Sequence, residues 1–193
     1  MIRGWHGVLG TFTGVALITV AVLPLAALAV WALARRRRVA GVPHAWRISL
    51  AEVGIVYGTA PWIWMTMLPS RRTDRVSLVP LRDLVTIFAH GPLTAAVQIV
   101  GNLLVLAALG FFAPIRFAAL ASTPRILALA AACSILIETL QYVLDLGRVS
   151  SVDDVLLNTA GAGLAALASR HWWRNAAPAE SSDRLPPVPA TRR

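Results

Sequence analysis

Apolar residues gather in long runs that short polar segments separate. The runs cover Val8 to Ala34, Ile48 to Leu68, the stretch between Pro92 and Pro114, the stretch from Pro124 to Leu144, and Val152 to Ala168. A transmembrane helix needs about 20 predominantly apolar residues, because the hydrocarbon core of a bilayer is about 30 Å thick. The pattern therefore predicts an all-α, polytopic transmembrane helix bundle with about five spans.

The first run could also be the hydrophobic region of a signal peptide, because Arg3 precedes it and small residues such as Ala32 and Ala34 close it. Such a region is typically about 7–15 residues long, which is much shorter than this run. Four consecutive arginines, Arg35 to Arg38, also follow it directly, as they do after a stop-transfer anchor. We therefore expect the first run to be a retained span.

The polar segments divide the chain into three regions. Residues 1–47 are expected to form the first span with its basic stop-transfer loop, and residues 48–174 a membrane domain with about four spans. Residues 175–193 are rich in Pro, Ala, Ser and charged residues, which predicts a disordered cytoplasmic tail. The segment 70–91 mixes arginines with aspartates and is expected to be an extramembrane loop.

The composition agrees with this membrane location. The chain of 193 residues is 57% hydrophobic and only 14% charged, with a mean hydropathy of +0.67. A soluble domain is typically about 45–50% apolar and about 25% charged, so a sizeable soluble domain is not expected. All 18 basic residues are arginines, and they flank the apolar runs instead of forming a basic stripe interleaved with aromatic residues. We therefore expect a multi-pass protein of the cell membrane with membrane lipids, and not nucleic acid, as its partners.

The arginines also predict an orientation. Under the five-span arrangement one side of the membrane holds 12 arginines, namely Arg35, Arg36, Arg37, Arg38, Arg47, Arg116, Arg125, Arg170, Arg174, Arg184, Arg192 and Arg193. The other side holds the remaining six, which are Arg3, Arg71, Arg72, Arg75, Arg82 and Arg148. The positive-inside rule then puts the N-terminus outside and the C-terminus in the cytoplasm. The four arginines between residues 71 and 82 run against this trend. An alternative explanation is that they bind an anionic ligand.

Polar residues within or beside the spans need an explanation, because a charged group at the bilayer centre costs about 2.5–3.5 kcal/mol on insertion scales. These residues are Asn102, Glu138, Gln141, Asp154 and Asn158. Glu138 and Gln141 lie three residues apart, and Asp154 and Asn158 lie four apart, so each pair shares one helix face. Gly161 and Ala165 continue the second face as a strip of small residues suited to close helix contact.

Each polar residue also has a purely structural explanation. The three amides of Asn102, Gln141 and Asn158 could serve only as hydrogen-bond partners between helices. Ser151 with Asp154 fits a capping box, which would leave Asp154 and its neighbour Asp153 with a local role. Capping does not apply to Glu138 in the middle of a span, and we expect it to pair with Arg148.

Chemical signatures of enzymes are missing from the sequence. There is no Gly-x-Ser-x-Gly elbow, no Gly-x-x-x-x-Gly-Lys phosphate loop and no His-Glu-x-x-His helix. The four histidines are scattered, and Cys133 is the single cysteine. We therefore expect no metal and no cofactor, and whether the chain is an enzyme stays open, with the balance against it.

Three segments together resemble the VanZ-like membrane proteins. They are Asn102 to Pro114 (NLLVLAALGFFAP), Glu138 to Gln141 (ETLQ), and the stretch GRVSSVDDVLLNTAGAGLA from Gly147. The piece SLVPLRDL from Ser77 is similar to a further segment of that family, with Leu81 where the family has an aromatic residue. The resemblance implies a shared polar cluster of Asn102, Glu138, Gln141, Arg148, Asp153, Asp154 and Asn158. It also implies an association with low-level resistance to teicoplanin and related glycopeptides.

Three functions are compatible with these observations. The leading one is a nonenzymatic membrane protein of the cell envelope that binds a lipid-linked or amphipathic ligand, such as an envelope precursor or the glycopeptide, and lowers glycopeptide sensitivity. An intramembrane enzyme acting on lipid-linked envelope precursors would instead use Glu138 as a general acid or base. A small transporter would use the same carboxylates as a proton path, but the sequence has no internal repeat to support it.

Overall fold

The computed structural model describes residues 11–70, 75–77, 79–89 and 91–174. Its helices are α2 (Phe12–Val39), α3 (Ala45–Thr66), α4 (Arg82–Ala89), α5 (Pro92–Val105), α6 (Ala107–Arg116), the short 3₁₀ helix η1 (Ala118–Leu120), α7 (Thr123–Val143), α8 (Val152–Ala168) and α9 (Arg170–Arg174). Two three-residue strands, β1 (Arg75–Ser77) and β2 (Val149–Ser151), pair in parallel. The predicted all-α class is confirmed, with this two-stranded ladder as a small addition.

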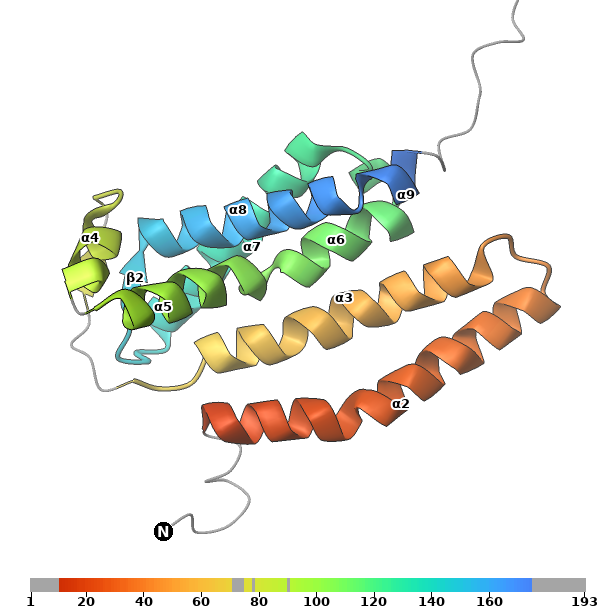
Figure 1. The fold of residues 1–193 in the computed structure, drawn as a ribbon, viewed down its shortest axis with the longest axis horizontal. Coiled ribbons are helices and arrows are strands. Elements are labelled where there is room, and N and C mark those ends of the chain that lie inside the picture. Colours follow the sequence, from red (N-terminus) through yellow and green to blue (C-terminus); the bar gives the residue numbers. More distant parts are fainter. Residues whose placement is uncertain (1–10, 71–74, 78, 90, 175–193) are drawn as a thin grey trace, which may run out of the picture.

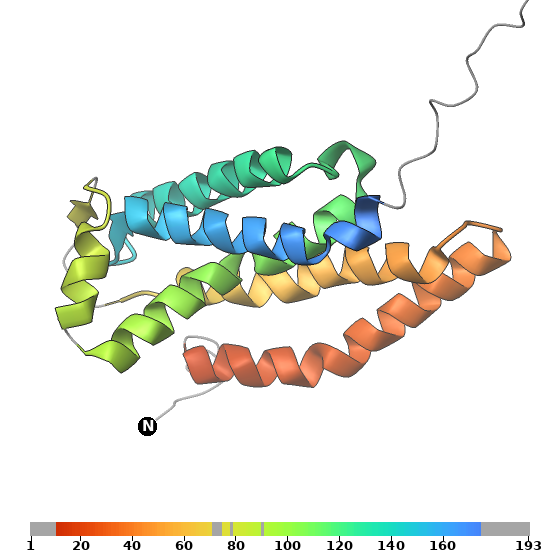
Figure 2. The same ribbon diagram turned by 45° about the horizontal axis from the view of Figure 1, so that its top comes forward.

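The long helices run back and forth along one direction, as Figures 1 and 2 show from two angles. α8 lies at the centre, where it packs against α5, α6 and α7, while α6 also packs against α3, and α3 against α2. The buried apolar core comes from the central helices and comprises Val105, Leu106, Ala113, Ile126, Ala130, Ile137, Ala162 and Ala166. α2 is therefore an outer helix whose main neighbour is α3.

Three helical segments within the described residues are long and apolar enough to cross a membrane. They are Phe12–Val39, the joined helices α5 and α6 over Pro92–Arg116, and Thr123–Val143. Large apolar side chains also face outward on these helices, for example Leu25 at 63% exposure and Val97 at 65%. An apolar exterior of this kind suits lipid and not water, which supports a membrane protein. α3 and α8 are not among the three segments, and α8 is only 17 residues long.

Helix boundaries follow the sequence prediction closely in some places and depart from it in others. α8 covers residues 152–168 as predicted, and α7 ends one residue before the predicted Leu144. α2 continues beyond Ala34 through the arginine run to Val39, because arginine is a good helix former and is favoured in a last helical turn. Residues 8–10 at its predicted start lie outside the described residues, as do residues 175–193 of the predicted tail.

The third predicted span departs most from expectation. It is divided at Leu106 into α5 and α6, and Pro114 does not end it but lies inside α6, which continues to Arg116. Proline is tolerated in membrane helices because neighbouring groups can satisfy the backbone that it frees. The predicted loop 70–91 likewise contains the strand β1 and the helix α4.

Glycines bring the central helices unusually close together. A Cβ atom on Gly161 of α8 would lie 1.9 Å from the Leu103 carbonyl oxygen of α5, and one on Gly110 of α6 would lie 2.1 Å from the Ala162 carbonyl oxygen of α8. The predicted close contact at Gly161 is confirmed, whereas Ala165, the other residue of the predicted strip, is only half-buried. The fully buried alanines of α8 are Ala162 and Ala166. The close approach sets the distance between α8 and α5 next to the polar residues described below.

Candidate functional site

Segments from across the sequence meet at one end of the bundle. The end of α7, the strand β2, the start of α8, the helix α4 and the start of α5 all lie there, on the left of Figure 1. β1 pairs with β2 so that Arg75 faces Val149 and Ser77 faces Ser151. This ladder holds the segment before α4 against the N-terminus of α8, although the two are about 70 residues apart in sequence.

Glu138 is buried, with 9% of the residue exposed, near the end of α7. Its Oε2 atom accepts a hydrogen bond from the Ser151 amide at 3.1 Å, and its backbone carbonyl accepts one from the Ser150 hydroxyl at 3.2 Å. Arg148 and Asp154 both lie close enough to act on the Glu138 charge. The carboxylate thus joins α7 to the start of α8.

The capping box predicted at the start of α8 forms only in part. The Ser151 hydroxyl accepts a hydrogen bond from the Asp153 amide at 3.2 Å, so Ser151 is the N-cap as expected. In a complete capping box the carboxylate three residues later would bind the N-cap amide. Here Glu138 of α7 binds that amide, which leaves Asp154 available for another partner.

Both aspartates lie in the first turn of α8, as the local capping explanation requires, but they also make contacts with distant segments, so local capping alone does not account for them. Asp153, only 2% exposed, accepts hydrogen bonds from the Leu81 amide at 2.5 Å and the Asp83 amide at 3.1 Å. These two bonds hold the start of α4, where Leu81 has a positive φ of 66°. Asp154 accepts a hydrogen bond from the side-chain amide of Asn102 on α5.

The other two amides of the polar cluster have separate partners. The Gln141 amide donates to the Thr66 carbonyl at 2.9 Å, which ties α7 to the end of α3. The Asn158 amide donates to the Ser134 hydroxyl at 2.8 Å between α8 and α7. The side-chain carbonyl oxygen of Asn158 is buried and has no hydrogen-bond partner among the described residues. The structure thus gathers five of the seven predicted residues around the start of α8 and gives Gln141 and Asn158 contacts of their own.

Four carboxylates gather around the start of α8. Glu138, Asp153, Asp154 and Asp83 approach one another, and Arg148 is the cation that acts on both Glu138 and Asp154. Carboxylates this close can accept hydrogen bonds from hydroxyl, amide or ammonium groups, and Arg148 can hold a phosphate or carboxylate. Within the described residues, no group of three or more histidine, cysteine or acidic side chains has the arrangement to hold a metal ion.

Comparison with protein families adds a decisive observation. The model of the VanZ/LLP1 family matches residues 54–173, which is more than half of the 193 residues. The chain belongs to the VanZ/LLP1 family. Neither the curated proteins nor the solved structures contain a match to it.

The VanZ/LLP1 match includes all seven residues of the polar cluster and begins inside α3. α2 and the first turns of α3 therefore lie outside the matched region. The sequence prediction missed two participants within the match, Asp83 and Ser134. The Asp83 carboxylate accepts a hydrogen bond from the Ser151 hydroxyl at 2.5 Å. Asp83 lies in the segment SLVPLRDL, which resembles the family, and this resemblance could have identified it. Nothing in the sequence pointed to Ser134.

Proposed function

We propose that this chain is a five-span membrane protein of the cell envelope that binds a lipid-linked or amphipathic ligand at the outer end of its helix bundle. Ligand binding there contributes to glycopeptide tolerance, including tolerance of teicoplanin. Membership of the VanZ/LLP1 family, which is linked to glycopeptide resistance, supports the general role. The polar cluster supports the location of the binding site.

The proposed topology has α2, α3, the joined α5 and α6, α7 and α8 as its spans. Its N-terminus is outside and its C-terminus is in the cytoplasm. Support comes from the alternating directions of these helices, which put the end of α2, the start of α3, the end of α6 and α9 at the end of the bundle opposite to β2. Arg38, Arg47, Arg116 and Arg170 belong to those segments, whereas Arg148 directly precedes β2. Cytoplasmic loops carry the excess of arginine, so the end with Arg148 and the polar cluster faces outward. A reporter that is active only after export can be fused to the C-terminus. A signal from that reporter would contradict this orientation.

One observation carries the ligand-binding proposal: Glu138 of α7 binds the Ser151 amide at the start of α8, which brings its carboxylate close enough to Asp154 for the Asp154 charge to act on it. Apolar residues would pack at these positions without that repulsion. Acidic groups held together at a cost in stability are typical of functional sites. A ligand with hydroxyl or amide donors next to a phosphate would bind both carboxylates and place its phosphate near Arg148, and lipid-linked envelope precursors have these groups.

The tolerance experiment compares variants at equal membrane levels. Overexpression of the natural sequence should raise the teicoplanin concentration that the cells tolerate. Glu138→Ala and Asn158→Ala should each abolish that rise, while a double change of Arg71→Ala and Arg72→Ala should leave most of it. Active cluster variants with an inactive arginine variant would contradict the proposal and place ligand capture in the segment 70–91.

The same pair of carboxylates favours one alternative, an intramembrane enzyme acting on lipid-linked precursors. Two neighbouring carboxyl groups that cannot easily ionise together can share a proton, and one can then act as an acid while the other acts as a base. Mass spectrometry of lipids that copurify with the protein separates the two functions. A retained isoprenoid-linked lipid that is unchanged after incubation supports binding, whereas its conversion to a product supports the enzyme.

A further inference from the structure

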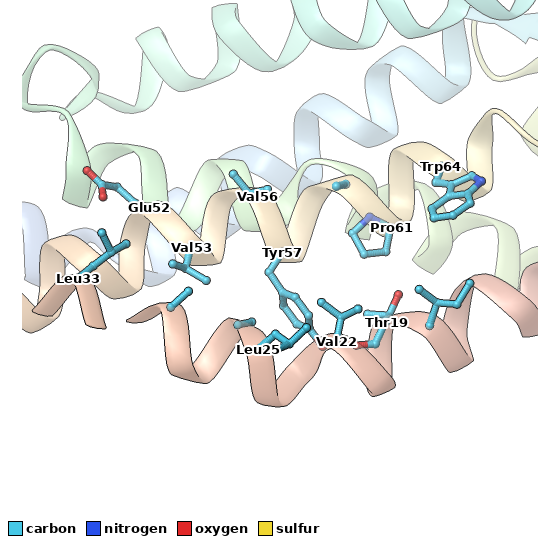
Figure 3. A pocket seen from close by; sticks show the side chains of 14 residues that line it. Thr19, Val22, Leu25, Leu33, Glu52, Val53, Val56, Tyr57, Pro61 and Trp64 are labelled. Carbon is cyan, nitrogen blue, oxygen red and sulfur yellow. Dashed lines mark hydrogen bonds between the residues drawn. The ribbon is translucent and has the colours of Figure 1, made fainter. Parts of the chain in front are cut away.

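A second feature lies between α2 and α3, on the side of the bundle away from the polar cluster. The two helices enclose an open groove of about 620 Å³. Its walls are almost wholly apolar, with Val22, Leu25 and Leu33 from α2 facing Val53 and Val56 from α3, as Figure 3 shows. Pro24 lies inside α2, and a proline within a helix bends it. The groove is therefore formed by α2 and α3 together, and its α2 wall contains a proline.

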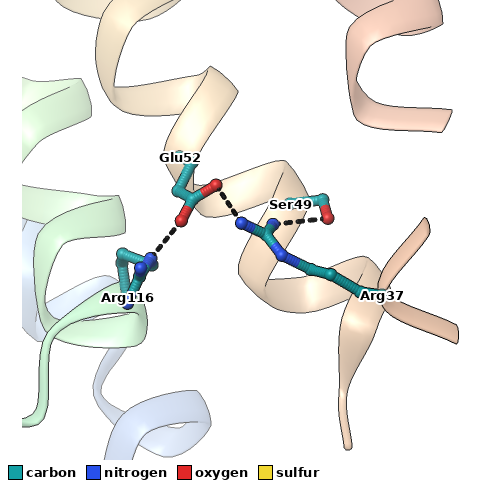
Figure 4. A network of polar contacts seen from close by, with 4 residues as sticks. All are labelled: Arg37, Ser49, Glu52 and Arg116. Atoms are coloured by element: carbon teal, nitrogen blue, oxygen red, sulfur yellow. Dashed lines mark hydrogen bonds and ion pairs between the residues drawn. The ribbon is translucent and has the colours of Figure 1, made fainter. Parts of the chain in front are cut away.

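A polar group closes one end of this groove. Glu52 is the charged residue of the lining, and it accepts hydrogen bonds from Arg37 of α2 and Arg116 of α6, both at 2.5 Å. Arg37 also donates to the Ser49 hydroxyl at 2.7 Å, as Figure 4 shows. Arg37 follows Leu33 by four residues, so it continues the face of α2 that lines the groove. α2 and α6 thus bring one arginine each to Glu52 of α3, at one end of the apolar groove.

The charges at that end do not balance. Two guanidinium groups meet one carboxylate, and the side chains remain 22% to 34% exposed. Each guanidinium has five N–H donors, and the hydrogen bonds within the described residues use two of them on Arg37 and one on Arg116. Arg35, Arg36 and Arg38 lie beside Arg37 in the same helix. The site is therefore suited to a phosphate group that could bind without displacing Glu52.

The length of the groove selects the kind of lipid. From Glu52 to Trp64 the lining extends along α3 for about 18 Å, at 1.5 Å per residue. Half of a bilayer's hydrocarbon core is about 15 Å thick. The groove thus matches one acyl chain of a leaflet phospholipid, whereas an isoprenoid chain that crosses the whole bilayer would extend beyond it.

We propose that the groove between α2 and α3 binds one anionic phospholipid, with an acyl chain along the groove and the phosphate at Arg37 and Arg116. The Tyr57 hydroxyl, which donates to the Thr19 carbonyl at 2.8 Å, holds the two walls together next to the chain. The bound lipid stabilises the contact of α2 with α3. The proposal does not depend on the ligand of the polar cluster, which lies at the opposite end of the bundle.

The test uses the full-length protein in detergent. It is titrated with phosphatidylglycerol and with phosphatidylcholine of equal chain length, and native mass spectrometry counts the bound lipid. We expect one tight phosphatidylglycerol, bound about fivefold more strongly than phosphatidylcholine, because two arginines against Glu52 leave one net positive charge and each such charge contributes about that factor. Equal affinities, or a clear preference for an isoprenoid phosphate, would overturn the proposal.

Two matched variants test the groove itself. Ala29 lines the groove, whereas Ala27 is exposed on α2 outside it, and the two side chains point about 200° apart around the helix. Ala29→Trp should fill the groove and lower the affinity for both lipids at least tenfold, while Ala27→Trp should leave both affinities unchanged. If the two variants bind alike, no lipid chain occupies the groove.

A charge variant tests the headgroup position. Glu52→Gln keeps an oxygen that can accept from one arginine but removes the competing negative charge. It should raise the affinity for phosphatidylglycerol about fivefold and leave that for phosphatidylcholine unchanged. A loss of phosphatidylglycerol affinity would mean that Glu52 and the arginines form only a structural ion pair. Glu138→Gln should not alter either affinity, which keeps this result separate from the function of the polar cluster.

Discussion

Replacement of Gly161 by alanine should strongly weaken the bundle. The added Cβ would lie 1.9 Å from the Leu103 carbonyl oxygen and 2.6 Å from its carbon, so α5 and α8 must separate by more than an ångström. Overpacking of this kind costs about 1–3 kcal/mol. The separation also strains the hydrogen bond of Asn102 to Asp154, and a hydrogen bond to a charged group contributes about 1.5–3 kcal/mol. The two contributions together give an expected loss of about 2.5–6 kcal/mol.

Gly101 provides the matched control. It also lies in α5, but a Cβ atom there would meet no atom within 4 Å. Gly101→Ala should be neutral or stabilising by about 0.5–1 kcal/mol, because alanine is the better helix former. Unfolding of both variants in the same detergent, followed by circular dichroism against denaturant, gives the comparison. Equal stability of Gly161→Ala and Gly101→Ala would refute the close contact of α5 with α8.

Three further changes test individual contacts. Asp153→Asn should lower the local stability of the start of α4 by about 1–3 kcal/mol, because one of its oxygens can no longer accept from the Leu81 or Asp83 amide. Hydrogen exchange should therefore accelerate at residues 81–83 while α7 stays protected. Tyr57→Phe removes the hydroxyl that binds the Thr19 carbonyl and should cost about 1 kcal/mol of unfolding free energy, whereas Tyr142→Phe at an exposed site should cost nothing measurable. Glu138→Gln and Arg148→Gln should show coupled losses of stability, and strictly additive losses in the double variant would show that the two residues do not interact.

The sequence was sufficient to predict most of the helices but not how they are interrupted. α8 has its predicted bounds because an N-cap serine begins it and a long apolar run follows. The division at Leu106 could not be predicted, because α5 and α6 are equally apolar and no proline or glycine marks the break. Pro114 suggested a helix end that lies slightly later, at Arg116, since a proline boundary is only a tendency in membrane helices.

The site residues could likewise be predicted only in part from the sequence. Asn102, Glu138, Arg148 and the two aspartates were placed together by the family resemblance, and the contacts join them around α8. Their partners depend on tertiary structure, so spacing along the chain could not reveal them. The strand pair β1 and β2, together with the Asp153 bonds to the start of α4, brings Asp83 beside Ser151. Glu52 drew no prediction because its arginine partners are 15 and 64 residues away.

The contacts at the start of α8 separate residues that hold the site together from residues that can bind a ligand. Both Asp153 oxygens accept backbone amides at the start of α4, so this carboxylate fixes a segment in place. Glu138 and Asp154 differ, because the hydrogen bonds of the described residues engage one oxygen of each. A carboxylate has about four acceptor positions, so both retain capacity for donors from outside the protein. Since Arg148 acts on the charges of Glu138 and Asp154, a ligand phosphate held by that arginine would lie next to both acceptors.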